Sequence, residues 1–261
     1  MYETDLTDFQ WQVIQETLPD TRRRKYSLCL IVNALLYLTK SGCQWRLLPR
    51  EFPSLPLVYY CFRRWQTDGL WARLNQAGAP PPPARHRQRA APSWPSRPSL
   101  AVLDAQSINC SERGVLDKGS EGHKKIRGRK RQLIVDTGGL LLAAHVGPAH
   151  ENDWIGGKAA RQNLAQQGFE RLHLVLVDAG YGGQPLAQWT RDHCGWRWRL
   201  ETAPGLTGSG GSTPVPTRWV VERSINCLQW DRRLSPDYEC ETSSAEATVY
   251  LSNIRHLIRK F

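Results

Sequence analysis

The sequence predicts an α/β protein in which a mixed sheet flanked by helices is preceded by a small all-α domain. Three observations predict this class. Apolar residues recur with helical spacing over residues 1–75, residues 76–99 are rich in proline, and strand-like runs alternate with helical patterns from residue 100 onward. We therefore expect a helical domain at 1–75, a linker at 76–99 and a mixed α/β domain at 100–261.

The first two predicted helices are amphipathic and have clear ends. The first follows a cap at Thr4 or Asp5 and stops at Pro19. The second contains the apolar run of 28–38 and ends near Gly42.

The third predicted helix, about 55–68, carries aromatic residues together with Arg63 and Arg64. A short fourth segment, LWARLN, follows Gly69. Three or four short helices with a basic, aromatic third member suit a helix-turn-helix DNA-binding module. They suit equally well a small bundle whose aromatic side chains form the core.

Beyond the linker, strand-like and helix-like segments alternate. Short apolar runs and one alternating run predict strands, and the longer amphipathic segments predict helices. The predicted strands are 100–104, 131–136, 140–147, 172–178 and 196–200, and the predicted helices are 153–168, 184–193, 219–234 and 243–259. The second and third strands flank a Thr-Gly-Gly turn and therefore predict a hairpin.

The composition indicates a basic, soluble protein. Lys and Arg number 35 against 24 Asp and Glu, which gives a net charge of +11. Such a surplus favours a polyanionic partner, nucleic acid before a membrane. No apolar run is long enough to span a membrane, and the acidic start lacks the features of a signal peptide. The 7 cysteines are scattered without a Cys-x-x-Cys pair, which excludes a zinc ribbon and argues for a cytoplasmic protein.

Three carboxylates are candidate metal ligands. Asp104 and Asp178 each end an apolar strand-like run, and Glu222 lies in a helical stretch with basic residues on both sides. Residues at the carboxyl ends of strands in open α/β sheets face the ligand crevice. Carboxylates from two strands and a helix could hold two Mg²⁺ ions for phosphodiester chemistry, although strand-end aspartates also serve as caps and turn formers.

A basic segment lies between the first two carboxylates. In GHKKIRGRKRQ, cationic side chains surround two glycines; they are Lys124, Lys125, Arg127, Arg129, Lys130 and Arg131. Runs of charge usually form a solvated loop. Beside candidate metal ligands in a protein of this charge, a strip that contacts DNA phosphates is favoured.

These segments together resemble the DDE transposases of bacterial insertion sequences, and most closely the insertion-sequence-five family. The resemblance covers nearly the whole chain except the linker and residues 203–217. Its motifs occur in the order of the family: GCQWRLLPREFPSLPLVYYCFRRWQTDGLWARLN, VLDAQSI, HKKIRGRKRQLIVDTGGLLLAAHVGPAHEND, VLVDAGYGG and RWVVERSINCLQWDRRLSPDYE.

The resemblance implies a ribonuclease-H-like catalytic domain at 100–261 behind a helical DNA-binding domain. It makes Asp104 on the first strand, Asp178 on the fourth strand and Glu222 on a helix the three catalytic, metal-binding residues. Arg218, four residues before Glu222, becomes a contact for phosphate or for Glu222 itself. The implied reaction is metal-dependent DNA cleavage and strand transfer with two Mg²⁺ or Mn²⁺ ions.

The implied partners are the terminal inverted repeats of the element and its target DNA, bound by a homodimer or larger assembly in the bacterial nucleoid. The proline tract at 76–99 and the Gly/Ser-rich segment 203–217 depart from the family pattern. Two alternatives therefore stay open: a decayed transposase that only binds DNA, and a nuclease that cuts DNA without joining it.

Overall fold

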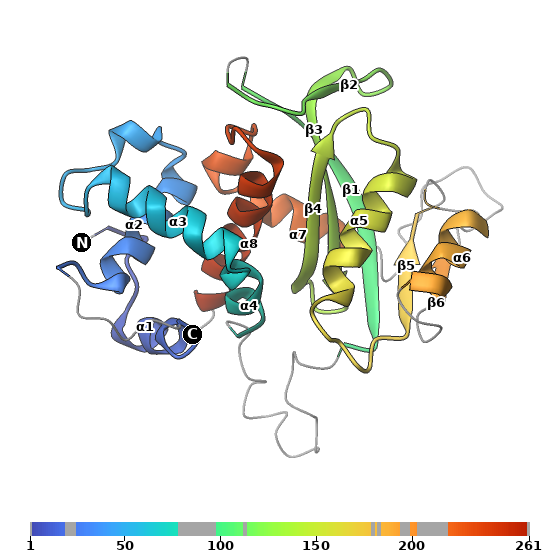
Figure 1. Cartoon of the computed structure of the whole chain (residues 1–261), viewed down its shortest axis with the longest axis horizontal. Helices are drawn as coiled ribbons and strands as arrows, with labels where there is room; N and C mark the ends of the chain where they lie inside the picture. Colours follow the sequence, from blue (N-terminus) through green and yellow to red (C-terminus); the bar gives the residue numbers. More distant parts are fainter. Residues whose placement is uncertain are drawn as a thin grey trace. The chain divides into compact units, whose positions relative to one another are not determined.

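The computed structural model describes residues 2–18, 25–77, 98–111, 114–178, 181, 184–193, 199–202 and 219–259 (Figure 1). The chain divides into two compact units. The helical unit is formed from Met1–Pro80, Ser111–Leu116 and Leu228–Phe261, and the sheet unit from Pro81–Cys110 and Asp117–Cys227. No helix in the described part of the chain is long and apolar enough to cross a membrane.

The helical unit is built from helices of both ends of the chain. They are α1 (Asp8–Gln15), α2 (Leu28–Ser41), η1 (Trp45–Leu47), α3 (Leu55–Thr67), α4 (Leu70–Ala77), η4 (Arg232–Leu234) and α8 (Thr242–Ile258). Their apolar faces form a shared core of leucine, isoleucine and aromatic side chains, including Leu35, Phe62 and Trp71. Burial of these faces drives the packing of helices that would be marginal in isolation.

The limits of the first two helices follow from local capping. Thr7 accepts a hydrogen bond from the Gln10 N–H, while the Gln10 side chain accepts one from the Thr7 N–H. This capping box starts α1 at Asp8, so the expected cap at Thr4 or Asp5 is wrong. The predicted end of α2 is confirmed, because Gly42 takes the left-handed conformation at φ 67°.

Helix α8 is part of the helical unit. It packs against α2, α3 and α4, and residues on all its sides are buried, which is typical of an internal helix. The sequence prediction assigned 100–261 to one domain. The structure instead places everything from Leu228 onward with the N-terminal helices. Helix α4 extends to Ala77, and the predicted linker residues 78–97 lie outside the described residues.

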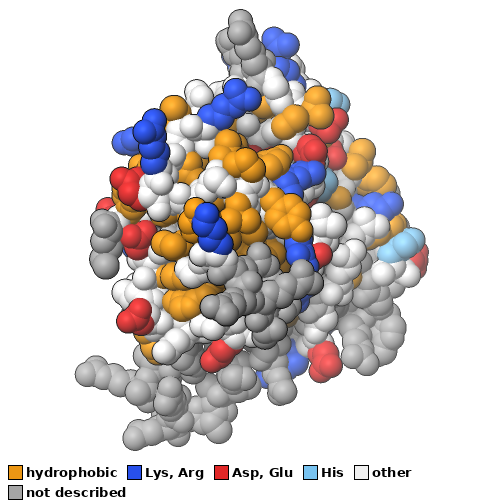
Figure 2. All heavy atoms as spheres, turned by 60° about the vertical axis from the view of Figure 1, so that its left-hand side comes forward, with side chains coloured by type: hydrophobic (Ala, Val, Ile, Leu, Met, Phe, Trp, Pro, Cys, Tyr) orange, Lys and Arg blue, Asp and Glu red, His pale blue; other side chains and the backbone are white. Residues whose placement is uncertain are grey.

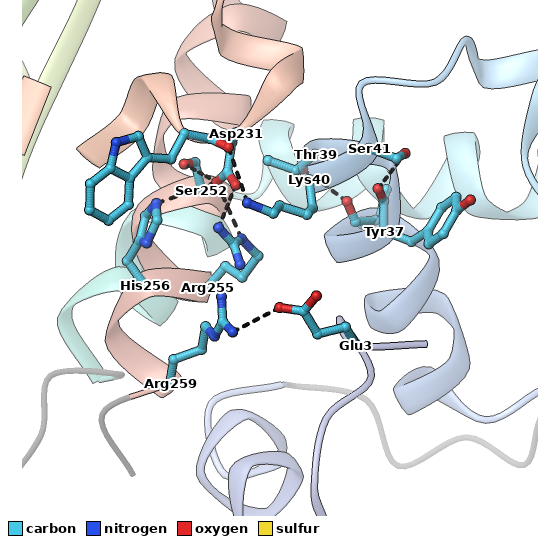
Figure 3. A network of polar contacts seen from close by, with 12 residues as sticks. Glu3, Tyr37, Thr39, Lys40, Ser41, Asp231, Ser252, Arg255, His256 and Arg259 are labelled. Atoms are coloured by element: carbon cyan, nitrogen blue, oxygen red, sulfur yellow. Dashed lines mark hydrogen bonds and ion pairs between the residues drawn. The ribbon is translucent and has the colours of Figure 1, made fainter. Parts of the chain in front are cut away.

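A buried polar network holds the segment before η4 against α8 (Figure 3). The Asp231 carboxylate has no exposed surface; it accepts hydrogen bonds from Ser252 at 2.5 Å and from the Arg255 guanidinium. His256 Nε2 lies 3.5 Å from the same carboxylate. Since an ionised carboxylate is costly to bury without a cation, Arg255 is what allows Asp231 to lie inside the unit.

The sheet unit contains six strands. They are β1 (Leu100–Asn109), β2 (Gly119–Glu121), β3 (Ile126–Asp136), β4 (Leu141–Pro148), β5 (Leu174–Val177) and β6 (Arg199–Thr202). Strands β4, β3 and β1 pair antiparallel, β5 and β6 continue the sheet in parallel, and the short β2 pairs with the start of β3. The unit also contains the helices α5 (Asp153–Ala165), α6 (Gln184–His193) and most of α7 (Trp219–Gln229). The expected mixed sheet with flanking helices and a helical N-terminal part is confirmed.

Two strands are longer than the sequence predicts. Strand β1 continues to Asn109 because its second half pairs with the first half of β3, which begins at Ile126. The hairpin of β3 and β4 is confirmed, and α5 begins at the predicted residue, Asp153, after the N-cap Asn152. Residues 194–198, including the start of the predicted strand 196–200, and residues 203–218 lie outside the described part.

The two faces of the sheet differ in what covers them. Helix α5 lies against one face, as Figure 1 shows, and its glycines pack on side chains of that face. A Cβ at Gly157 would be 3.3 Å from Leu103, and one at Gly156 would be 2.8 Å from the Gln132 side chain. Because side chains alternate along a strand, Asp104 lies on the opposite face from Leu103.

Candidate active site

Asp104 and Asp178 come from adjacent parallel strands. In the register of β1 and β5, Val102 lies beside Leu176, so continuing both chains by two residues brings Asp104 level with Asp178. Residues level with each other on parallel strands share a face. Both side chains are half-buried. The pairing of β1 and β5 itself ends at Val102 and Leu176, and its register, extended by two residues, would set Asp104 in the middle of β1 on the same face as Asp178 directly after β5.

Tyr181 is a buried residue whose hydroxyl is influenced by several carboxylates. Its side chain is 2% exposed, and its hydroxyl donates a hydrogen bond to Gln132 Oε1. Burial raises the pKa of Tyr181 far above its ordinary value, and the carboxylates of Asp153, Asp104 and Asp178 raise it further. The three carboxylates act on the hydroxyl from different places: Asp153 is also paired with Lys130, and Asp104 lies on the sheet face opposite Gln132.

Glu222 lies on a different element from the two aspartates. It occupies the first turn of α7 and is exposed. The neighbouring residues attach this helix to the β3–β4 turn: Arg223 donates to the Gly138 carbonyl at 2.8 Å, and Ser224 donates to that of Gly139 at 2.9 Å. Contacts to backbone carbonyls on two successive residues fix the start of α7 against the sheet.

The candidate carboxylates fit a divalent metal ion in part. Two aspartate side chains on one face supply the oxygen donors that Mg²⁺ and Mn²⁺ prefer. Among the described residues, however, no group of three or more His, Cys, Asp or Glu side chains is arranged to hold a metal ion. Glu222 therefore does not join Asp104 and Asp178 in this arrangement.

The predicted basic strip is divided by the fold. Lys124 and Lys125 lie in the turn between β2 and β3, and with Arg127 at the start of β3 they are exposed. The other three cations of the strip are buried, with exposed fractions of 0% for Arg129, 6% for Lys130 and 0% for Arg131.

This burial corrects the expectation of a continuous phosphate-contacting surface, because β3 begins within the basic segment. Lys130 lies on the α5 face and donates to the Glu151 carbonyl and the Asp153 carboxylate, both at 2.9 Å. Arg131 pairs in register with Gln106 and so lies on the face of Asp104. A cation on this face offsets part of the carboxylate charge.

The two candidate arginines of α3 are engaged within the helical unit. Arg63 donates to Glu241 at 2.6 Å and to Ser244 at 2.9 Å, and this hydrogen bond to a carboxylate raises the pKa of Arg63. The Arg64 Nε atom lies 3.7 Å from Oδ2 of Asp68, with which it forms an ion pair. Arg218 lies outside the described residues.

The aromatic residues of α3 are divided between the core and the surface. Phe62 and Trp65 are buried in the core, whereas Tyr59 and Tyr60 are 45% and 55% exposed. Figure 2 shows the left-hand side of Figure 1 turned forward, where hydrophobic side chains reach the surface among scattered Lys and Arg side chains.

Sequence reasoning missed the polar pairs that support the site. In the sequence, Tyr181 is only one letter of the motif VLVDAGYGG, and Gln132 is one residue of the predicted strand 131–136. Their hydrogen bond joins residues 49 positions apart in the sequence, so no local sequence pattern indicates it. Asp136 shapes the turn after β3, since its side chain accepts hydrogen bonds from the N–H groups of Gly138 and Leu140.

Two family models match the chain. One, described as "Putative transposase of IS4/5 family", matches residues 6–75, and the other, described as "Transposase DDE domain", matches residues 95–203. With the two aspartates on one face of the sheet, these matches define the chain as a DDE transposase. Its N-terminal match gives the type: the chain belongs to the IS4/5 transposases of insertion sequences.

The second match includes Asp104 and Asp178 and ends before Glu222. Without the short β2, the strands lie in the order β4, β3, β1, β5, β6, and only β3 runs antiparallel to the other four. This order and these directions are as expected for a ribonuclease-H-like sheet. A comparison with curated proteins found no match to the chain.

Among solved structures, the chain is similar to that of the Mos1 mariner paired end complex with Mn, at 10% identity. The match covers 97% of this chain and 84% of that chain with a TM-score of 0.31. A likeness at this level adds nothing to the assignment.

Proposed function

We propose that this transposase catalyses metal-dependent DNA cleavage and strand transfer at the ends of an insertion sequence. The observation that supports the proposal is the parallel register of β1 and β5, which would set Asp104 level with Asp178 if it continued two residues beyond Val102 and Leu176. A pair of carboxylates there can hold a hard divalent cation. Mg²⁺ or Mn²⁺, two ions in the proposed site, would supply Lewis-acid activation of water and stabilise the leaving oxygen.

The residues of the chain position and balance this chemistry. Asp104 is held rigidly because it lies inside a ladder with β3 on one side and close to β5 on the other. Glu222 is the proposed third ligand. Its helix would have to approach the aspartates for a complete site, since the described residues contain no three-ligand group.

DNA contacts are proposed for the exposed cations. Lys124, Lys125 and Arg127 form a basic turn in the sheet unit that can meet phosphates without base specificity. Arg63, Arg64 and Arg218 remain proposed DNA contacts. For Arg63 and Arg64, phosphate would have to compete with the acidic partners described above. Terminal repeats, target DNA and a second copy of the chain are the proposed partners.

A second candidate function follows from the missing three-ligand group. A chain that cannot gather Glu222 with the two aspartates would bind element ends without cutting them. Such a protein would act only as a sequence-specific DNA-binding protein. The two functions differ in whether cleavage occurs at all, so one assay separates them.

The test is cleavage of DNA that carries the terminal repeats, measured with Mg²⁺ and with Mn²⁺. We expect Asp104→Asn and Glu222→Gln to abolish cleavage because each removes a charged oxygen donor, while end binding in a gel-shift assay is retained. Glu170→Gln is the matched control, because Glu170 is an exposed carboxylate of the same unit outside the site. Full cleavage by either site variant would refute the assignment of these carboxylates.

A further inference from the structure

We propose that Tyr181 is a positioning residue that fixes the backbone of Asp178 in the active site. The inference rests on the proposed function of the two aspartates. Asp178 stands one residue beyond the end of β5, where the strand ladder no longer holds it. Something else must therefore set its distance from Asp104, and Tyr181 makes three contacts that can do so.

The first contact closes the turn that follows β5. The Tyr181 N–H donates to the Asp178 carbonyl at 3.0 Å. The second contact is the hydrogen bond from the Tyr181 hydroxyl to Gln132 Oε1, which joins this turn to β3 in the middle of the sheet. Since Gln132 is fully buried within two ladders, it is a rigid anchor.

The third contact is the packing of the Tyr181 ring on α5. A Cβ at Gly157 would lie 2.9 Å from both Cδ1 and Cε1 of the ring, so any residue other than glycine would displace it. At the preceding position, a Cβ at Gly156 would lie 2.8 Å from Gln132 Cγ and Nε2. Each glycine within a helix costs about 1 kcal/mol relative to alanine. Two successive glycines in α5 therefore make room for the tyrosine and its anchor at the expense of helix stability.

A chemical role for the hydroxyl is disfavoured by its surroundings. Tyr181 is 2% exposed, so its hydroxyl is shielded from solvent, and this hydroxyl donates a hydrogen bond to Gln132. A buried hydroxyl whose hydrogen bond is directed to Gln132 is not placed to contact DNA, which leaves positioning as its function.

The test measures Mn²⁺ binding to the full-length chain by electron paramagnetic resonance, together with the Mn²⁺ dependence of end cleavage. We expect Tyr181→Leu and Gly157→Ala to weaken Mn²⁺ binding about 10- to 100-fold, the usual effect of removing a residue that orients a metal ligand. Tyr181→Phe keeps the ring packing and loses only the anchor to Gln132, so its effect should be smaller.

The control is Leu164→Ala, which removes a buried side chain two turns along α5 from Gly157. It should lower the melting temperature without changing Mn²⁺ binding. Equal weakening in this control, or unchanged binding in Tyr181→Leu, would overturn the positioning role. If Asp104→Asn and Asp178→Asn bind Mn²⁺ as tightly as the wild type, the proposed function fails, and the inference fails with it.

Discussion

Asp231 shows how a single buried residue fastens the segment before η4 to α8 within the helical unit. Its carboxylate is 0% exposed and is satisfied by Ser252 and Arg255 of α8. A second ion pair in the same unit, between Arg259 and Glu3 at 2.9 Å, is largely exposed. Breaking a buried ion pair costs much more stability than breaking an exposed one, because water screens only the exposed pair.

We predict that Asp231→Ala lowers the free energy of unfolding by about 3–5 kcal/mol, because Arg255 is then left buried without its partner. The control Glu3→Gln, which breaks the exposed pair, should cost at most about 1 kcal/mol. Urea unfolding of both variants measures the difference. Similar effects of the two substitutions would show that the Asp231 network does not hold the unit together.

At the scale of elements, the sequence predicts local structure well and assembly less well. The hairpin of β3 and β4 and the helices α2, α5 and α6 follow from periodicity, turns and caps near each element. The sequence predicts a phosphate-contacting strip over the first half of β3, because its side chains are charged and only the ladders with β1 and β4 explain their burial. Long-range pairing of this kind leaves no local signal.

The candidate site shows the same division. Asp104 and Asp178 could be selected from the sequence because each follows an apolar run, and the register then brings them level. The buried state of Arg129 and Arg131 could not be foreseen from a run of like charges. The sequence also could not show that α8 belongs to the helical unit, since its helical pattern indicates that it packs but not against which helices.

We predict that removing the C-terminal residues from Glu241 onward unfolds the helical unit selectively. Helix α8 buries Val249, Leu251, Ile254, Leu257 and Ile258. At about 1.5–3 kcal/mol each, their loss is comparable with the whole stability of a domain, about 5–15 kcal/mol. Hydrogen exchange should show lost protection in α2 and α4, while the amides of β1 and β3 remain protected as an internal control. Unchanged protection of α2 and α4 would contradict the discontinuous unit.

At the scale of the whole molecule, the net charge of +11 has more than one role. Arg127 and Lys125 are exposed and are proposed to contact DNA. Lys124 pairs with Glu121, Arg131 lies buried on the face of Asp104, and Arg255 neutralises Asp231. Part of the basic excess thus stabilises the fold and balances carboxylates. A count of charges alone would overstate the surface available to nucleic acid.

We propose that the carboxylate site of the sheet unit serves strand transfer as well as DNA cleavage. The most direct test incubates the wild-type chain and Asp104→Asn with pre-cut terminal-repeat DNA, target plasmid and Mg²⁺, and measures joined products. We predict joining by the wild type and none by the variant, because the proposed site would serve both steps. Efficient cleavage of uncut ends without any joining would instead identify a nuclease, and binding without cleavage would identify a DNA-binding protein.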